Sequence, residues 1–127
     1  MAIYGQTRAL NEGEEEVLYQ TSTLLALNTD FDTPIGTNST SAMWIPRGNI
    51  REAVVAGFSD QASDSSGVLI EQSMDAVTVH STPWSTTAVA STYLSQVVEL
   101  TAPYFRARWQ NAGVTQTIFF FRVTARR

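Results

Sequence analysis

The stretch Tyr104–Val123, YFRARWQNAGVTQTIFFFRV, decides the predicted fold. Phe105, Ala107 and Trp109 alternate with polar or basic residues, and a period of two places them on one face of a strand, with Trp109 in the interior. After a short turn-forming segment, residues 115–123 carry β-branched and aromatic side chains on both faces, which is typical of a strand covered on two sides. We therefore predict a β-hairpin whose second strand lies in the middle of a sheet.

The rest of the chain also reads as short strands separated by turns. The segments predicted as strands are 16–28, 51–58, 68–72, 76–81, 86–91 and 96–100. The segments between them are rich in Ser, Thr, Asn, Asp, Gly and Pro, and no long segment keeps a helical period of apolar residues. We expect an all-β fold with hardly any helix. Residues 16–127 are predicted to form one antiparallel, jelly-roll-like β-sandwich domain, preceded by an extended N-terminal arm of residues 1–15.

The composition narrows the classes of function. The 127 residues suit one domain with its own core, and there is no cysteine for a disulfide or a thiolate metal site. The net charge of -4 disfavours nucleic acid as a partner. No segment approaches the roughly 20 apolar residues of a membrane span, and the start of the chain lacks a signal-peptide core, so we expect neither a membrane partner nor export by the usual signal.

Every one of the eight basic residues is Arg. Arg is preferred over Lys in protein interfaces, although the composition of the source genome explains the bias equally well. Glutamates cluster near the start of the chain and arginines in its last quarter, so we expect the arginines to pair with protein carboxylates, including those of neighbouring subunits. The residues predicted to contact other subunits are Ile3, Tyr4, Arg8, Leu10, Arg106, Arg108 and Arg126.

Few residues are suited to catalysis or metal binding. His80 is the single histidine and is expected at the surface or in an interface. The chain has no G-x-S-x-G motif and too few soft ligands for zinc. Asp60, Asp64, Glu71 and Asp75 lack the spacing of an EF-hand calcium loop and are expected to be solvated turn residues. We predict no enzyme activity, no metal and no cofactor.

Exposed aromatic side chains would indicate carbohydrate binding, because flat rings stack on the faces of sugars. Trp84 follows Thr82 and Pro83 in a predicted loop, and Tyr93 is a possible neighbour. These two are the candidate glycan-facing aromatics, with packing inside the fold as the simpler alternative.

Two segments, GVLIEQSMDA and PYFRARWQNAGVTQTIF, are similar to a pattern in small β-sandwich proteins of tailed-bacteriophage virions. The resemblance covers residues 58–123, and Ala76 departs from it where the pattern has Gly. The matching residues are Gly67, Leu69, Ile70, Glu71, Gln72, Ser73, Asp75, Pro103, Tyr104, Arg106, Asn111, Gln116 and Phe119.

The resemblance implies a virion structural protein. Together with the single small domain and its arm, it favours a capsid decoration (cement) protein that is made in the host cytoplasm and binds the major capsid protein on the capsid surface. A homotrimer is the expected assembly. Two alternatives stay open: a receptor- or carbohydrate-binding module of a tail fibre or head surface, and a head-tail connector or tail component.

Overall fold

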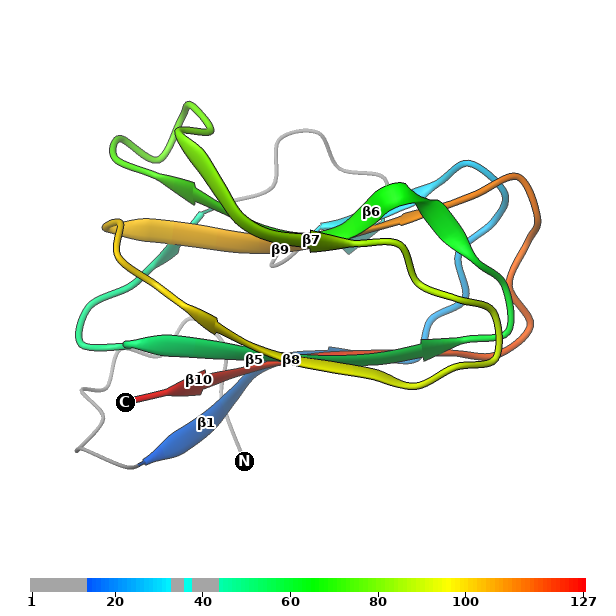
Figure 1. Ribbon diagram of the computed structural model, residues 1–127, viewed down its shortest axis with the longest axis horizontal. Coiled ribbons are helices and arrows are strands. Elements are labelled where there is room, and N and C mark those ends of the chain that lie inside the picture. Colours follow the sequence, from blue (N-terminus) through cyan, green and yellow to red (C-terminus); the bar gives the residue numbers. More distant parts are fainter. Residues whose placement is uncertain (1–13, 33–35, 38–43) are drawn as a thin grey trace.

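The protein is a sandwich of two antiparallel sheets (Figure 1). The computed structural model describes residues 14–32, 36–37 and 44–127. The first sheet contains, in spatial order, β1 (Glu15–Thr21), β10 (Phe119–Arg126), β5 (Glu52–Ser59) and β8 (Leu94–Glu99). The second contains β3 (Gly36–Thr37), β2 (Asp30–Asp32), β9 (Tyr104–Asn111), β6 (Ser63–Ser73) and β7 (Ser81–Thr86), with β4 (Ile45–Pro46) also pairing with β9. Within these described residues there is no helix, and hence none long and apolar enough to cross a membrane.

The order of the strands is that of a jelly roll. Four antiparallel pairs are nested along the chain: β1 with β10, β2 with β9, β5 with β8, and β6 with β7. Pairing of β10 with β5 and of β9 with β6 then joins these pairs into two sheets. This arrangement confirms the predicted all-β sandwich and its jelly-roll character.

The core fills the space between the sheets and centres on three aromatic rings. Trp109 of β9 is fully buried, and its ring centroid lies 5.1 Å from that of Phe119 and 5.5 Å from that of Phe121, both on β10. Both contacts are edge-to-face, the arrangement that aromatic quadrupoles favour. The alternation predicted for β9 is confirmed, because Phe105, Ala107 and Trp109 are all fully buried.

The predicted hairpin is wrong, although its second strand lies in the middle of a sheet as expected. β9 and β10 belong to different sheets, and residues 112–118 carry the chain from one layer to the other. The reason is the packing: Trp109 and Phe121 meet across the core, which requires their strands to face one another and not to pair edge to edge.

Several strand boundaries also differ from the predictions. β1 ends at Thr21, and residues 22–29 form a loop that inserts Leu25 into the core. β6 begins at Ser63 within the predicted polar loop. One strand, β7, spans residues 81–86, from the end of the predicted strand 76–81 to the start of the predicted strand 86–91. The residues before it form a turn, because the Asp75 carboxylate accepts hydrogen bonds from the backbone N–H groups of Val77 and Thr78. Most of the predicted N-terminal arm lies outside the described residues.

Candidate functional site

Two of the predicted interface arginines lie on the outer face of the second sheet. The Arg106 Nε donates to Glu71 Oε1 at 2.8 Å, and the Arg108 Nη1 lies 3.8 Å from Glu71 Oε2. The Arg106 guanidinium also lies 4.3 Å from the centre of the Trp44 ring, which is a cation–π contact. Glu71 is therefore not a solvated turn residue but a buried strand residue opposite Arg106. Both arginines find a carboxylate partner within their own chain.

Arg126 joins three strands of the first sheet. Its Nε donates to Glu15 of β1 at 2.8 Å, and its Nη1 donates to Glu52 of β5 at 3.4 Å. The hydrogen bond that Arg126 donates to Glu15 is the main reason that the pKa of Arg126 is raised. The remaining predicted interface residues, Ile3, Tyr4, Arg8 and Leu10, lie outside the described residues.

His80 and Asp75 organise the loop between β6 and β7. His80 is exposed, as expected, and its Nδ1 accepts a hydrogen bond from the backbone N–H of Met74 at 3.0 Å. Asp75 accepts from the backbone N–H groups of Thr78 and Val77, each at 2.9 Å, and these bonds lower its pKa to about 2. These hydrogen bonds stabilise the turn between β6 and β7. Among the described residues no group of three or more His, Cys, Asp or Glu side chains could hold a metal ion.

Exposed apolar side chains gather at one end of the sandwich. Three loops, 22–29, 87–93 and 112–118, meet at the right-hand end of Figure 1, and we call them the apolar loop end. None of the three contains a charged residue. Their exposed large apolar side chains are Leu24, Leu27, Val89, Tyr93, Val114 and Ile118. Elsewhere in the described chain, the exposed large apolar residues are Met74, Val77, Val79 and Val97.

Hydrogen bonds between the loops hold the apolar loop end in place. The buried side chain of Gln116 accepts from the Leu25 N–H at 2.8 Å and donates to the Ser59 hydroxyl at 3.0 Å. The backbone of Ser59 in turn accepts from the Ser91 N–H at 2.8 Å. Asp60 accepts from the Thr117 side chain and from the backbone of residues 117 and 118, which lowers its pKa well below the usual range. The backbone that bears the exposed apolar side chains is therefore held in place by hydrogen bonds.

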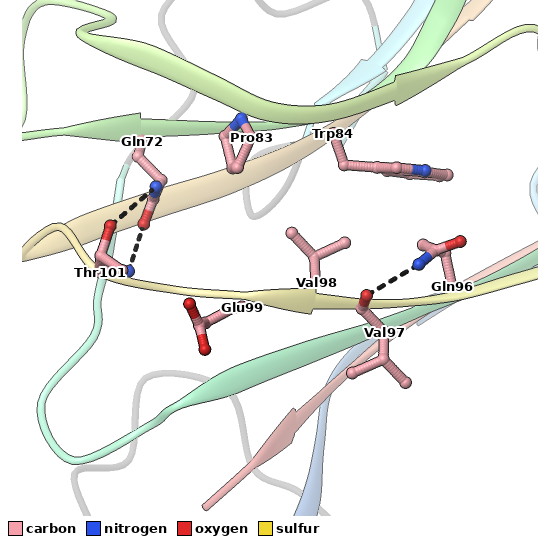
Figure 2. A pocket seen from close by; sticks show the side chains of 8 residues that line it. All are labelled: Gln72, Pro83, Trp84, Gln96, Val97, Val98, Glu99 and Thr101. Carbon is pink, nitrogen blue, oxygen red and sulfur yellow. Dashed lines mark hydrogen bonds between the residues drawn. The ribbon is translucent and has the colours of Figure 1, made fainter.

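A cleft of about 300 Å³ opens between the edge strands of the two sheets, β7 and β8. Figure 2 shows the Trp84 indole edge-on on the β7 side, above the side chains of Val98 and Gln96 on β8. The cleft is lined by Gln72, Pro83, Trp84, Gln96, Val97, Val98, Glu99 and Thr101. We call it the β7–β8 cleft. Its combination of one aromatic ring with amide and hydroxyl groups suits a small polar ligand with an apolar face.

The two predicted glycan-facing aromatics differ in their relation to the cleft, which Trp84 lines and Tyr93 does not. Trp84 is half-buried on a strand, not in an exposed loop, and it packs partly against the core. Tyr93 is 60% exposed but does not line the cleft. The sequence reasoning also missed Gln96, a polar residue that alternates with Leu94 and Val98 on the inward face of β8. A polar residue at an inward-facing position of a strand could have indicated a site at Gln96.

The fold is shared with a solved structure, the crystal structure of PBSX exported protein XepA. The TM-score is 0.70 at 17% sequence identity, and the match covers 94% of this chain and 40% of that one, so the chain spans less than half the length of XepA. No curated protein matches the sequence. The family described as the N-terminal domain of the uncharacterised protein YqxG matches residues 15–125, which is nearly the whole sandwich. The chain therefore belongs to the YqxG N-terminal domain family.

Proposed function

We propose that the protein is a structural component of a phage particle, and that its finer role is to decorate the head by binding the major capsid protein. Two findings support the link to phage: the resemblance of residues 58–123 to virion proteins, and the fold shared with PBSX exported protein XepA. The location on the capsid surface and assembly as a homotrimer are part of the proposal.

The apolar loop end is the observation that carries a docking role. Leu24, Leu27, Val114 and Ile118 are each about half exposed, on two loops joined by backbone and side-chain hydrogen bonds. Exposed apolar side chains on neighbouring loops are typical of the centre of a protein–protein interface. The carboxylate of Asp60 also lies at this end, where it accepts hydrogen bonds from Thr117 and Ile118. Because the loops are already bonded to one another, little conformational entropy is lost when they dock.

The chemistry of this end favours a protein over other partners. Its three loops contain no Lys or Arg, so they offer nothing to phosphates of nucleic acid or to anionic lipid headgroups. A trimer would present three such ends to a repeating lattice at once. Modest affinity per site then suffices, since linked sites bind with a high effective concentration.

A paired substitution tests the docking role. Leu27→Ser combined with Val114→Ser removes two apolar contacts of about 1 kcal/mol each, so binding to undecorated capsids should weaken about 30-fold in co-sedimentation. Val77→Ser is the matched control, because Val77 is 80% exposed on the β6–β7 loop, at the other end of the sandwich. All three side chains are exposed, so the fold should be retained. Equal binding by the paired variant and the control would contradict the proposal.

A further inference from the structure

We infer that the β7–β8 cleft is a binding site for an uncharged sugar ring of a glycan. This inference is independent of the head-decorating role, since the cleft involves other residues than the apolar loop end. Three features of the cleft favour this ligand: the aromatic wall, the polar groups opposite it, and the absence of a cation in the lining.

The aromatic wall is the indole of Trp84. The cleft separates this ring from β8, and a flat ligand bound in it would pack against the indole (Figure 2). Val98, only 4% exposed, points toward Trp84 from β8 and makes the deeper part of the cleft apolar. The C–H face of a sugar ring suits a site with an aromatic ring on one side and an aliphatic group on the other.

Polar groups stand at the rim, where sugar hydroxyls would lie. Gln96 is exposed on β8 on the side that faces Trp84, and its amide donates to the neighbouring Val97 carbonyl at 2.9 Å (Figure 2). Gln72 acts differently: its Oε1 accepts from the N–H groups of Thr101 and Ala102 at 2.8 and 2.9 Å and so fixes the end of the cleft. The rim therefore offers donors and acceptors together, which matches hydroxyl groups that both donate and accept.

The charge and the volume of the cleft limit which ligands fit. No Lys, Arg or His lines the cleft, and the carboxylate of Glu99 points away from Trp84 (Figure 2), so an anionic sugar or a phosphate would find no cation there. A volume of about 300 Å³ is at the lower end for ligand pockets, which suits one or two sugar units and not a long buried chain. Uncharged hexoses and N-acetylated aminosugars are the fitting class.

The experiment uses the full chain with chitotetraose and maltotetraose as probes. Tryptophan fluorescence and two-dimensional NMR follow the titration, with the Trp84 indole N–H signal as the local readout. The variants are Trp84→Ala, Trp84→Phe and Gln96→Ala, with Tyr93→Ala as a control for an exposed aromatic ring outside the cleft. Because Trp84 packs partly on the core, the Phe variant and the exposed Gln96 keep the test valid if Trp84→Ala does not fold.

We expect saturable binding of at least one probe, with shifts confined to the cleft residues. Trp84→Ala and Gln96→Ala should weaken it about tenfold or more, Trp84→Phe should weaken it less, and Tyr93→Ala should leave it unchanged. The inference is overturned if neither probe binds at about 10 mM, which corresponds to an affinity too weak to matter. Binding that survives in Gln96→Ala and Trp84→Phe alike but is lost in Tyr93→Ala would also overturn it, because the site would then lie at the apolar loop end.

Discussion

Adding one methyl group at Gly57 should damage the centre of the core. Gly57 lies on β5, where the indole of Trp109 packs directly against its backbone. A Cβ atom there would be 2.7 Å from Trp109 Cζ3 and 3.1 Å from the backbone oxygen of Phe120, whereas ordinary contacts begin at about 3.4 Å. Trp109 is fully buried and held by edge-to-face contacts with two phenylalanine rings, so it has no room to retreat.

We expect Gly57→Ala to lower the free energy of unfolding by about 1–3 kcal/mol, the usual range for overpacking a tight core. For a domain of this size each kcal/mol corresponds to about 3–5 °C, so the melting temperature should fall by about 3–15 °C. Thermal and urea unfolding followed by circular dichroism measure both quantities. The slope of the urea transition should not change, because the extent of the folded structure is the same.

Two further variants separate overpacking from the general effect of replacing a glycine. Gly113→Ala is the control: nothing lies within 4 Å of an added Cβ and its φ is not in the left-handed region, so the protein should be equally or slightly more stable. Trp109→Phe removes the clashing atom, so the double variant with Gly57→Ala should lose less stability than the two single losses combined. A melting temperature for Gly57→Ala equal to that of the parent would refute the close packing described for Trp109.

Three other perturbations test separate parts of the structure. Phe121→Ala should cost about 3–5 kcal/mol in thermal or urea unfolding, because it leaves a cavity between the sheets; an unchanged melt would place β10 away from the centre. The pKa of Asp75 is lowered in the folded protein, so the stability that its carboxylate contributes is present above about pH 4 and is lost as the pH falls toward 2. The difference in melting temperature between the parent and Asp75→Ala should therefore shrink over that range. A constant difference would show that the ionised carboxylate does not stabilise the turn. Deleting residues 1–12 should leave the sandwich folded, because every described strand is retained, but should reduce capsid occupancy; full occupancy would exclude a role of the arm in docking.

The sequence predicted the character of the strands better than their connections. Alternation identifies Phe105 and Trp109 as one buried face, since side chains on a strand point in turn to opposite sides. It cannot tell whether the next apolar strand pairs with the first or faces it from the other layer. Residues 112–118 are suited to connect two paired strands or two strands of different sheets. The packing of Trp109 against Phe121 across the core decides between these two arrangements.

The candidate sites were less predictable, because they depend on how the strands and loops are divided between the two sheets. The cleft joins Trp84 of β7 to Gln96 of β8, and their proximity follows from the two edges of the jelly roll lying one above the other. Pro83 indicated a loop, but proline is also compatible with an edge strand, where its missing N–H breaks no ladder bond. The apolar loop end was hidden for a similar reason, since the apolar run at residues 24–27 resembled the end of a core strand.

The ion pairs that the arginines form within the chain change the salt dependence expected for docking. Arg106 and Arg108 contact Glu71, and Arg126 contacts Glu15 and Glu52, so these charges already have partners in the isolated chain. An interface built on them would weaken as salt rises from about 0.1 M to about 1 M, because the screening length falls from about 10 Å to about 3 Å. Docking through the apolar loop end should instead be little affected by sodium chloride and strengthened by sulfate, which is excluded from apolar surface. Capsid binding measured across both salts distinguishes the two interfaces, and a steep loss in sodium chloride would assign docking to the arginine-bearing faces.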